Sequence, residues 1–100
     1  MSMHIISKRR LTQFWKRFAD AETPLRAWHT LVQKRNYANS HEVKADFSSA
    51  DFLGKGKAVF DIGGNKYRLV VTMRYDLGRV YIRHVSTHEE YDKLVEAKKL

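Results

Sequence analysis

The segment from Gly64 to Asp92, GNKYRLVVTMRYDLGRVYIRHVSTHEEYD, decides the fold of this chain. It contains two runs in which apolar and polar residues alternate, separated by the turn sequence Asp76-Leu77-Gly78. Such alternation is typical of strands with one buried face, because successive side chains of a strand point to opposite faces. We therefore expect two neighbouring antiparallel strands, followed by a closing helix.

The two strands are expected to share one apolar face and one cationic face. In residues 66–75 the apolar side consists of Tyr67, Leu69, Val71, Met73 and Tyr75, and the other side of Arg68, Val70, Thr72 and Arg74. In residues 79–86, Val80 and Ile82 fit the buried side. This choice also places His84 on the buried side and leaves Tyr81 and Arg83 on the open face. A β-bulge would reverse part of the assignment.

A third strand is predicted over residues 57–62, with Ala58, Phe60 and Ile62 toward the core. The sequence Gly63-Gly64-Asn65 predicts a tight turn into the next strand, because glycine and asparagine tolerate positive φ angles. Residues 57–86 should therefore form a three-stranded antiparallel meander.

The first half of the chain is predicted to supply helices behind this sheet. After a brief strand at residues 3–7, a helix over 7–20 is expected, with Ser7 as its N-cap. A second helix is expected over 24–37, with Thr23 as N-cap and Pro24 in the first position, forming an antiparallel hairpin with the first. Residues 39–56 show no clear period and are expected to be a connector.

The closing helix is predicted over residues 86–100. Its start contains two overlapping capping boxes, in which Ser86 pairs with Glu89 or Thr87 pairs with Glu90. His88 and Tyr91 are three residues apart, so they occupy neighbouring positions in the first turn.

Composition limits the classes of function. The chain has 100 residues and is expected to be a single domain, 1–100. Its net charge of +8 favours polyanions, above all nucleic acid. The absence of cysteine excludes disulfides, zinc–thiolate sites and thiol catalysis. No apolar run approaches the length that spans a bilayer, so no membrane association and a cytoplasmic location are expected.

The residues of the Gly64–Asp92 segment suit RNA cleavage without a metal. When the 2′-hydroxyl attacks the adjacent phosphate, the enzyme must supply a base, an acid and cations. His88 lies at a strand-to-helix junction next to the face with Arg68 and Arg83, and Tyr91 could stack on a base or donate a hydrogen bond. His88 could equally be a cap residue, and Tyr91 could simply pack. No histidine pair on one helix flanks a glutamate, so neither a metal site nor a cofactor is predicted.

The order and spacing of several motifs resemble the HigB family of bacterial toxin–antitoxin toxins. The motifs are Gly63-Gly64-Asn65, Tyr67-Arg68-Leu69, Tyr81-Ile82-Arg83 and Thr87-His88-Glu89-Glu90-Tyr91-Asp92, together with His4-Ile5-Ile6-Ser7 and Lys44-Ala45-Asp46-Phe47. The resemblance covers nearly the whole chain. It implies an α+β, RelE-like fold: a twisted antiparallel sheet packed by two N-terminal helices, with a short C-terminal helix.

The same resemblance implies a metal-independent mRNA endoribonuclease that acts on ribosome-bound message. It also implies a helix-turn-helix, HigA-like antitoxin as partner, with operator DNA bound only through the antitoxin complex. Transferred by motif, the catalytic candidates are Arg68, His88 and Tyr91, and the RNA-binding candidates are Lys44, Asn65, Lys66 and Arg83. The alternative is a non-catalytic basic module that binds RNA or the ribosome.

Overall fold

The computed structural model describes residues 2–98 and contains a five-stranded sheet with the order β1-β5-β4-β3-β2. The strands are β1 His4–Ile6, β2 Asp51–Gly54, β3 Lys57–Ile62, β4 Tyr67–Arg74 and β5 Arg79–Thr87. β1 is parallel to β5, and the other neighbouring pairs are antiparallel. The predicted meander of β3, β4 and β5 is confirmed. Gly63 and Gly64, in the turn between β3 and β4, both have positive φ.

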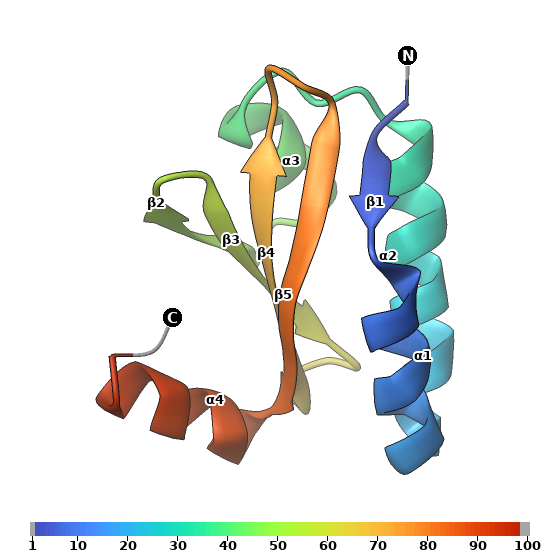
Figure 1. The fold of residues 1–100 in the computed structure, drawn as a ribbon, viewed down its shortest axis with the longest axis vertical. Helices are drawn as coiled ribbons and strands as arrows, with labels where there is room; N and C mark the ends of the chain where they lie inside the picture. The colour runs from blue at the N-terminus through green and yellow to red at the C-terminus, as the bar shows by residue number, and fades with distance from the viewer. Residues whose placement is uncertain (1, 99–100) are drawn as a thin grey trace.

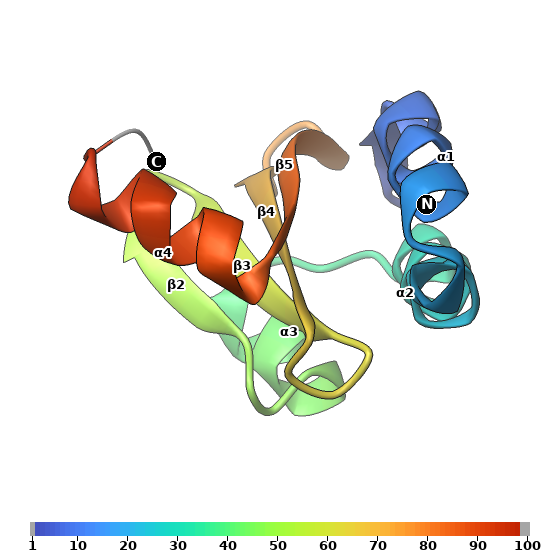
Figure 2. The same ribbon diagram turned by 90° about the horizontal axis from the view of Figure 1, so that it is seen from below.

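The helices lie on both faces of this sheet (Figures 1 and 2). α1 Lys8–Arg17 and α2 Glu22–Lys34 run antiparallel side by side on one face, and α3 Ser40–Asp46 packs against the same face. α4 His88–Glu96 leaves the end of β5 and crosses the opposite face. No helix within residues 2–98 is long and apolar enough to cross a bilayer.

The main core lies between the sheet and α1–α3. α1 contributes Leu11, Phe14 and Trp15, and α2 contributes Leu25, Trp28 and Val32; in each helix every later residue lies three or four positions after an earlier one, and the three form one apolar stripe. Trp28 and Phe47 each contact the ring of Phe60 edge-on, with centroid distances of 5.4 and 5.0 Å. This packing fixes β3 and β4, on which the candidate site is built.

The predicted start of the first helix is confirmed in position, whereas that of the second helix is wrong. Ser7 occupies the N-cap position of α1, but its side chain makes no capping hydrogen bond. Thr23 lies inside α2, whose N-cap is Ala21. A 3₁₀ turn over Ala19–Ala21 continues directly into α2, so no separate cap forms at Thr23. α2 also ends at Lys34, before the predicted residue 37.

The prediction of an irregular connector over residues 39–56 is wrong. Asn39 accepts a hydrogen bond from the Glu42 backbone N–H at 3.1 Å and starts α3. A helix of seven residues is too short to show a clear period, but Asn39 followed three residues later by Glu42 was a usable start signal. β2 was missed because it has four residues, all exposed at the sheet edge.

A β-bulge in β5 overturns the predicted position of His84. Val71 pairs with Ile82, but Val70 pairs with His84, so Arg83 is the extra residue. The alternation of side chains therefore changes phase between Ile82 and His84. His84 lies half-buried on the same face as Val70, opposite to the core face that carries Val80 and Ile82.

The predicted open cationic face is partly covered. Val59 and Val70 lie on that face, yet they are only 3% and 1% exposed and do not belong to the main core cluster. α4 crosses the face there and contacts β4 and β5, with Leu94 half-buried. A small apolar layer beneath α4 therefore holds the closing helix against the sheet.

The start of α4 resolves the two alternative capping boxes in favour of Thr87 with Glu90. The Thr87 side chain accepts from the Glu90 backbone N–H at 3.1 Å, and Glu90 Oε1 accepts from the Thr87 backbone N–H at 2.9 Å. Ser86 is instead buried in β5. α4 ends at Glu96, and the predicted end of the helix at residues 99–100 lies outside the described residues.

Candidate active site

Arg68 is the centre of the candidate site. It lies near the start of β4, and its side chain is 12% exposed. Its Nη1 lies 3.0 Å from Oδ1 of Asp61, its register partner on β3. Its Nη2 donates to Asn65 Oδ1 at 2.6 Å. A guanidinium held by two neighbours in this way loses little conformational entropy when it binds a phosphate.

His88 is positioned by the start of α4 and by the turn before β4. It is the first residue of α4, directly after the capping residue Thr87, and its N–H donates to the Lys66 carbonyl at 3.1 Å. The turn before β4 and the start of α4 are thereby tied together. As a result, the imidazole lies beside the Arg68 guanidinium, with 2.9 Å between His88 Nδ1 and Arg68 Nη2.

The contacts of His88 determine its tautomer. A guanidinium can only donate, so Nδ1 must accept the hydrogen bond from Arg68 and cannot carry a proton. The proton of the neutral ring therefore resides on Nε2, which lies 3.4 Å from Asp92 Oδ2 one helical turn later. Asp92 is placed to stabilise a second proton on this ring, as a carboxylate does for a histidine base.

Tyr91 completes the cluster from the same helix. Its ring centroid lies 5.9 Å from Cζ of Arg68, and the side chain is half-buried. Burial raises the pKa of the Tyr91 hydroxyl, and the nearby carboxylates of Asp51, Asp92 and Asp61 raise this pKa further, against the opposing charge of Arg68. The hydroxyl therefore stays protonated at neutral pH and can donate.

The structure brings together four of the seven predicted site residues: Arg68, His88, Tyr91 and Asn65. Lys66 turns away, because its Nζ pairs with Asp20 Oδ2 at 2.9 Å, and only its carbonyl contacts the cluster. Lys44 lies on α3 and donates from Nζ to the Ala50 carbonyl at 2.7 Å.

Arg83 also lies apart from the cluster, at the bulge in β5. Its Nε donates to Thr72 Oγ1 at 3.0 Å, and its Cζ lies 5.2 Å from the centroid of the Tyr81 ring. Arg83 therefore belongs to the open face, as predicted, but lies outside the contacts that join Arg68 to His88.

Sequence reasoning missed the carboxylates of the site. Asp61 lies between Phe60 and Ile62 and therefore points away from the core, and antiparallel pairing across the Gly63–Lys66 turn places it opposite Arg68. The sequence could have indicated Asp92 as a neighbour of His88, because it follows His88 by four residues on one helix. Among residues 2–98, no three His, Cys, Asp or Glu side chains gather as metal ligands would.

The sequence model of the HigB toxin family, described as the RelE-like toxic component of a toxin–antitoxin system, matches residues 21–94. The chain belongs to the HigB toxin family. The match includes every residue of the Arg68 cluster, and the resemblance seen in the motifs is thereby confirmed, as is the α+β, RelE-like fold.

Curated HigB proteins are similar over most of their length. The mRNA interferase toxin HigB of Escherichia coli strain K12 is 33% identical over 93 residues, which is 90% of this chain and 88% of that protein. The mRNA interferase HigB of E. coli O6:H1 strain CFT073 is 28% identical over 94 residues, covering 92% and 91%. The mRNA interferase HigB of Shigella flexneri is 33% identical over 93 residues.

In this HigB chain the cluster combines the parts that phosphate chemistry requires. Arg68 presents a fixed donor fork, His88 has an unprotonated nitrogen, and Tyr91 retains a proton. All three surround one point, at the junction of the turn before β4 and the start of α4.

Proposed function

We propose that this chain is an mRNA interferase, an endoribonuclease toxin that cuts messenger RNA and stops translation. The observation that carries the proposal is the 2.9 Å contact between Arg68 Nη2 and His88 Nδ1, which sets a phosphate-binding group directly against a potential base. The names of the HigB relatives, all mRNA interferases, support the same activity. Arg68, His88 and Tyr91 are the proposed catalytic residues, with Asn65 as a neighbouring contact.

The proposed reaction begins when the scissile phosphate binds Arg68. A phosphate oxygen takes the hydrogen bonds that Nη2 gives to Asn65 and His88 in the free protein, while Asp61 keeps its contact with Nη1. His88 Nδ1 then becomes available as a base. Substrate binding and activation of the base are thereby one event, because both depend on Arg68.

His88 next removes the proton from the RNA 2′-hydroxyl, whose oxygen attacks the adjacent phosphorus. Arg68 stabilises the added negative charge on the phosphoryl oxygens, and Asp92 stabilises the protonated imidazole. The bond from phosphorus to the 5′-oxygen breaks, and Tyr91 donates a proton to that oxygen. The products are a 2′,3′-cyclic phosphate and a 5′-hydroxyl, and no metal takes part.

The proposed partners follow from the family. The description of a toxin–antitoxin system supports a protein antitoxin, which we propose is a helix-turn-helix, HigA-like protein. Operator DNA would be bound only through that complex. We further propose that the toxin acts in the cytoplasm on ribosome-bound message, with Lys44, Lys66 and Arg83 among the cations that approach RNA.

Cleavage assays with the full chain test the catalytic assignment. Purified wild type and His88→Ala are incubated with translating ribosomes and a defined mRNA, and the cut ends are mapped. We expect cuts with 5′-hydroxyl ends from wild type and about a 100-fold or greater loss in His88→Ala. His41→Ala, at an exposed position on α3, is the matched control and should cut normally.

The outcomes separate the nuclease from a non-catalytic binding module. RNA binding without cleavage by wild type, with or without ribosomes, would favour the module. Equal cleavage by wild type and His88→Ala would remove His88 from the mechanism. Ends that carry a 5′-phosphate would contradict attack by the 2′-hydroxyl. The same pair of variants should differ in growth arrest on induction.

A further inference from the structure

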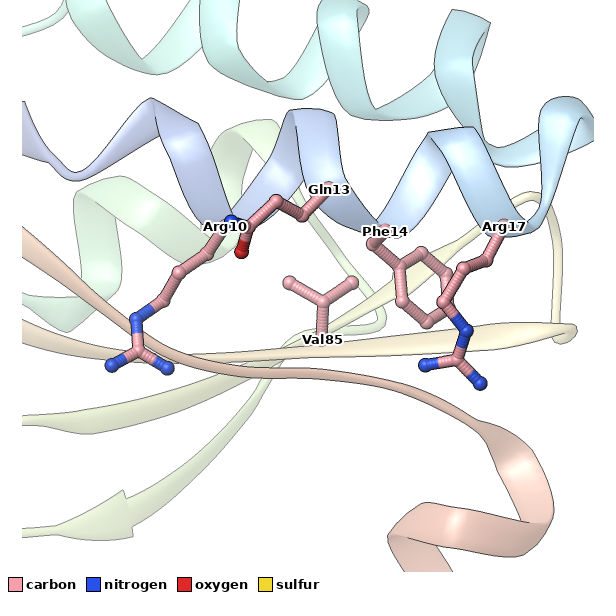
Figure 3. Close-up of a pocket in the computed structure, with 5 residues that line it drawn as sticks. All are labelled: Arg10, Gln13, Phe14, Arg17 and Val85. Atoms are coloured by element: carbon pink, nitrogen blue, oxygen red, sulfur yellow. The ribbon is translucent and has the colours of Figure 1, made fainter.

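A groove runs along β5 between α1 and α4. At one end it is lined by Arg10, Phe14 and Arg17 of α1 and by Val85 of β5. Figure 3 shows the Arg10 and Arg17 side chains extending from α1 toward β5, on either side of Val85. A second hollow shares Arg10 and Val85 with the first and continues along α4 to Lys93. The two hollows adjoin at Arg10 and Val85 and are together called the groove.

The groove carries four cations that have no acidic partner among the described residues 2–98: Arg10, Arg17, Arg83 and Lys93. None of them forms an ion pair with a carboxylate within residues 2–98, whereas Arg26, Arg35 and Arg74 each do. The carboxylate that lines the groove, Glu90, is already engaged by the Thr87 N–H in the capping box. The groove therefore presents uncompensated positive charge.

The pKa of His84, which lines the groove, is affected by the same positive charge. Its pKa is lowered, first by burial and then by the positive charges of Arg10, Lys57 and Arg83. An imidazole surrounded in this way stays neutral at pH 7 and adds no repulsion to a cation-rich surface. An anion in the groove would instead interact favourably with these neighbours.

The wall of the groove near Arg17 packs against the strand that carries Arg68. Phe14, in the groove wall, and Phe18 contact the Tyr67 ring at centroid distances of 5.3 and 5.6 Å. Tyr67 precedes Arg68 and pairs across the sheet with Thr87, the residue before His88. The Arg17 end of the groove and the Arg68–His88 contact therefore lie at the same end of β4 and β5.

We propose that this groove binds the single-stranded RNA that flanks the scissile phosphate, through four phosphate contacts from Arg10, Arg17, Arg83 and Lys93. The proposal rests on the nuclease function above and places the substrate RNA beside α1 and α4. The half-buried apolar side chains of Val85 and Leu94 lie between the cations and offer small apolar contacts to exposed bases. A positively charged groove that follows the nucleic-acid backbone is typical of proteins that bind single strands without sequence preference.

Salt-dependent binding tests the proposal independently of cleavage. A fluorescent single-stranded RNA with 2′-O-methyl groups, which cannot attack, is titrated with the full chain at several salt concentrations. One variant carries Arg10→Gln, Arg17→Gln, Arg83→Gln and Lys93→Gln. The control loses the same charge elsewhere, through Arg9→Gln, Lys16→Gln, Lys34→Gln and Arg79→Gln, all exposed positions outside the groove.

We expect the groove variant to bind at least about tenfold more weakly than the control at moderate salt. Its slope of log affinity against log salt should fall by about 2.8, from four contacts at about 0.7 each, because each phosphate contact releases counterions. A third variant, with Arg10→Lys, Arg17→Lys and Arg83→Lys, keeps the charge and should keep the slope. Circular dichroism establishes that all variants are folded.

Three results would overturn the proposal. One is a groove variant with the wild-type slope, and another is an equal loss in the groove and control variants. The third is unchanged RNA binding with lost binding of the cognate antitoxin, which would assign the groove to the protein partner. If RNA binding depended on the groove but wild type cleaved no RNA, the groove proposal would hold and the proposed nuclease function would fail.

Discussion

The two cationic regions of this molecule are built differently. At the Arg68 cluster both basic side chains have a carboxylate neighbour: Asp61 beside Arg68 and Asp92 beside His88. In the groove, the cations Arg10, Arg17, Arg83 and Lys93 lack such carboxylates among residues 2–98. Fixed geometry suits one reacting phosphate, whereas free charge suits many phosphates of any sequence.

The comparison predicts that the two regions respond differently to a change that preserves charge. Arg68→Lys should lower the single-turnover rate of RNA cleavage by about 100- to 1000-fold, because a lysine has no planar group that can contact Asp61 and a phosphate together. RNA affinity should change little. Arg74→Lys, on the same strand but paired with Asp76, is the control. A fully active Arg68→Lys would show that the cluster supplies only charge.

The second prediction concerns the proton on Tyr91. Tyr91→Phe should lower the cleavage rate by about 100-fold at neutral pH, because the leaving oxygen loses its acid. Since the Tyr91 pKa is raised, the wild-type rate should hold to pH values above the ordinary tyrosine value of about 10 and fall only beyond it. The pH profile is measured against uncatalysed RNA cleavage.

The control for Tyr91 is Tyr75→Phe. Burial also raises the pKa of Tyr75, but its side chain packs against the core and lies outside the site. Its rate and alkaline limit should match those of wild type. If Tyr91→Phe kept both the wild-type rate and the alkaline limit, the acid would have to be another group.

The smallest expected effect belongs to a single cation of the groove. Arg17→Gln should weaken RNA binding a few-fold and reduce the salt slope by about 0.7, while the maximal cleavage rate stays unchanged. Arg17→Gln should therefore lower the RNA affinity and not the rate, whereas Arg68→Lys should lower the rate and change the affinity little. A large fall in the maximal rate would place Arg17 at the reacting phosphate and would remove the distinction between the two regions.

The sequence predicted those parts of the fold in which local pattern and burial agree. Tyr67, Leu69, Val71 and Met73 alternate along β4 and are all buried, and the stripes of α1 and α2 face the core. The capping sequence also limited the start of α4 to two residues, of which Thr87 is used. These features depend on neighbours within a few positions along the chain.

The features that the sequence did not predict depend on pairing between distant segments. The extra residue in β5 becomes visible only when Val70 is seen opposite His84. Val59 and Val70 looked like outward residues, but α4 covers that face and buries them. In the candidate site, the types of Arg68, His88 and Tyr91 suggested the chemistry, while Asp61 required the register of β3 against β4.

The bulge at Arg83 determines on which face of the sheet each later side chain of β5 lies. A shift of the pairing in β5 by one residue sends every later side chain to the opposite side of the sheet. With the bulge, Ser86 shares the face of Arg68, and α4 starts on the side away from α1 and α2. If the same residues paired without a bulge, Val85 would lie opposite Arg68, and Ser86 and the start of α4 would turn to the other side. By absorbing Arg83 as an extra residue, the bulge keeps the His88 imidazole and the Arg68 guanidinium on one side of the sheet.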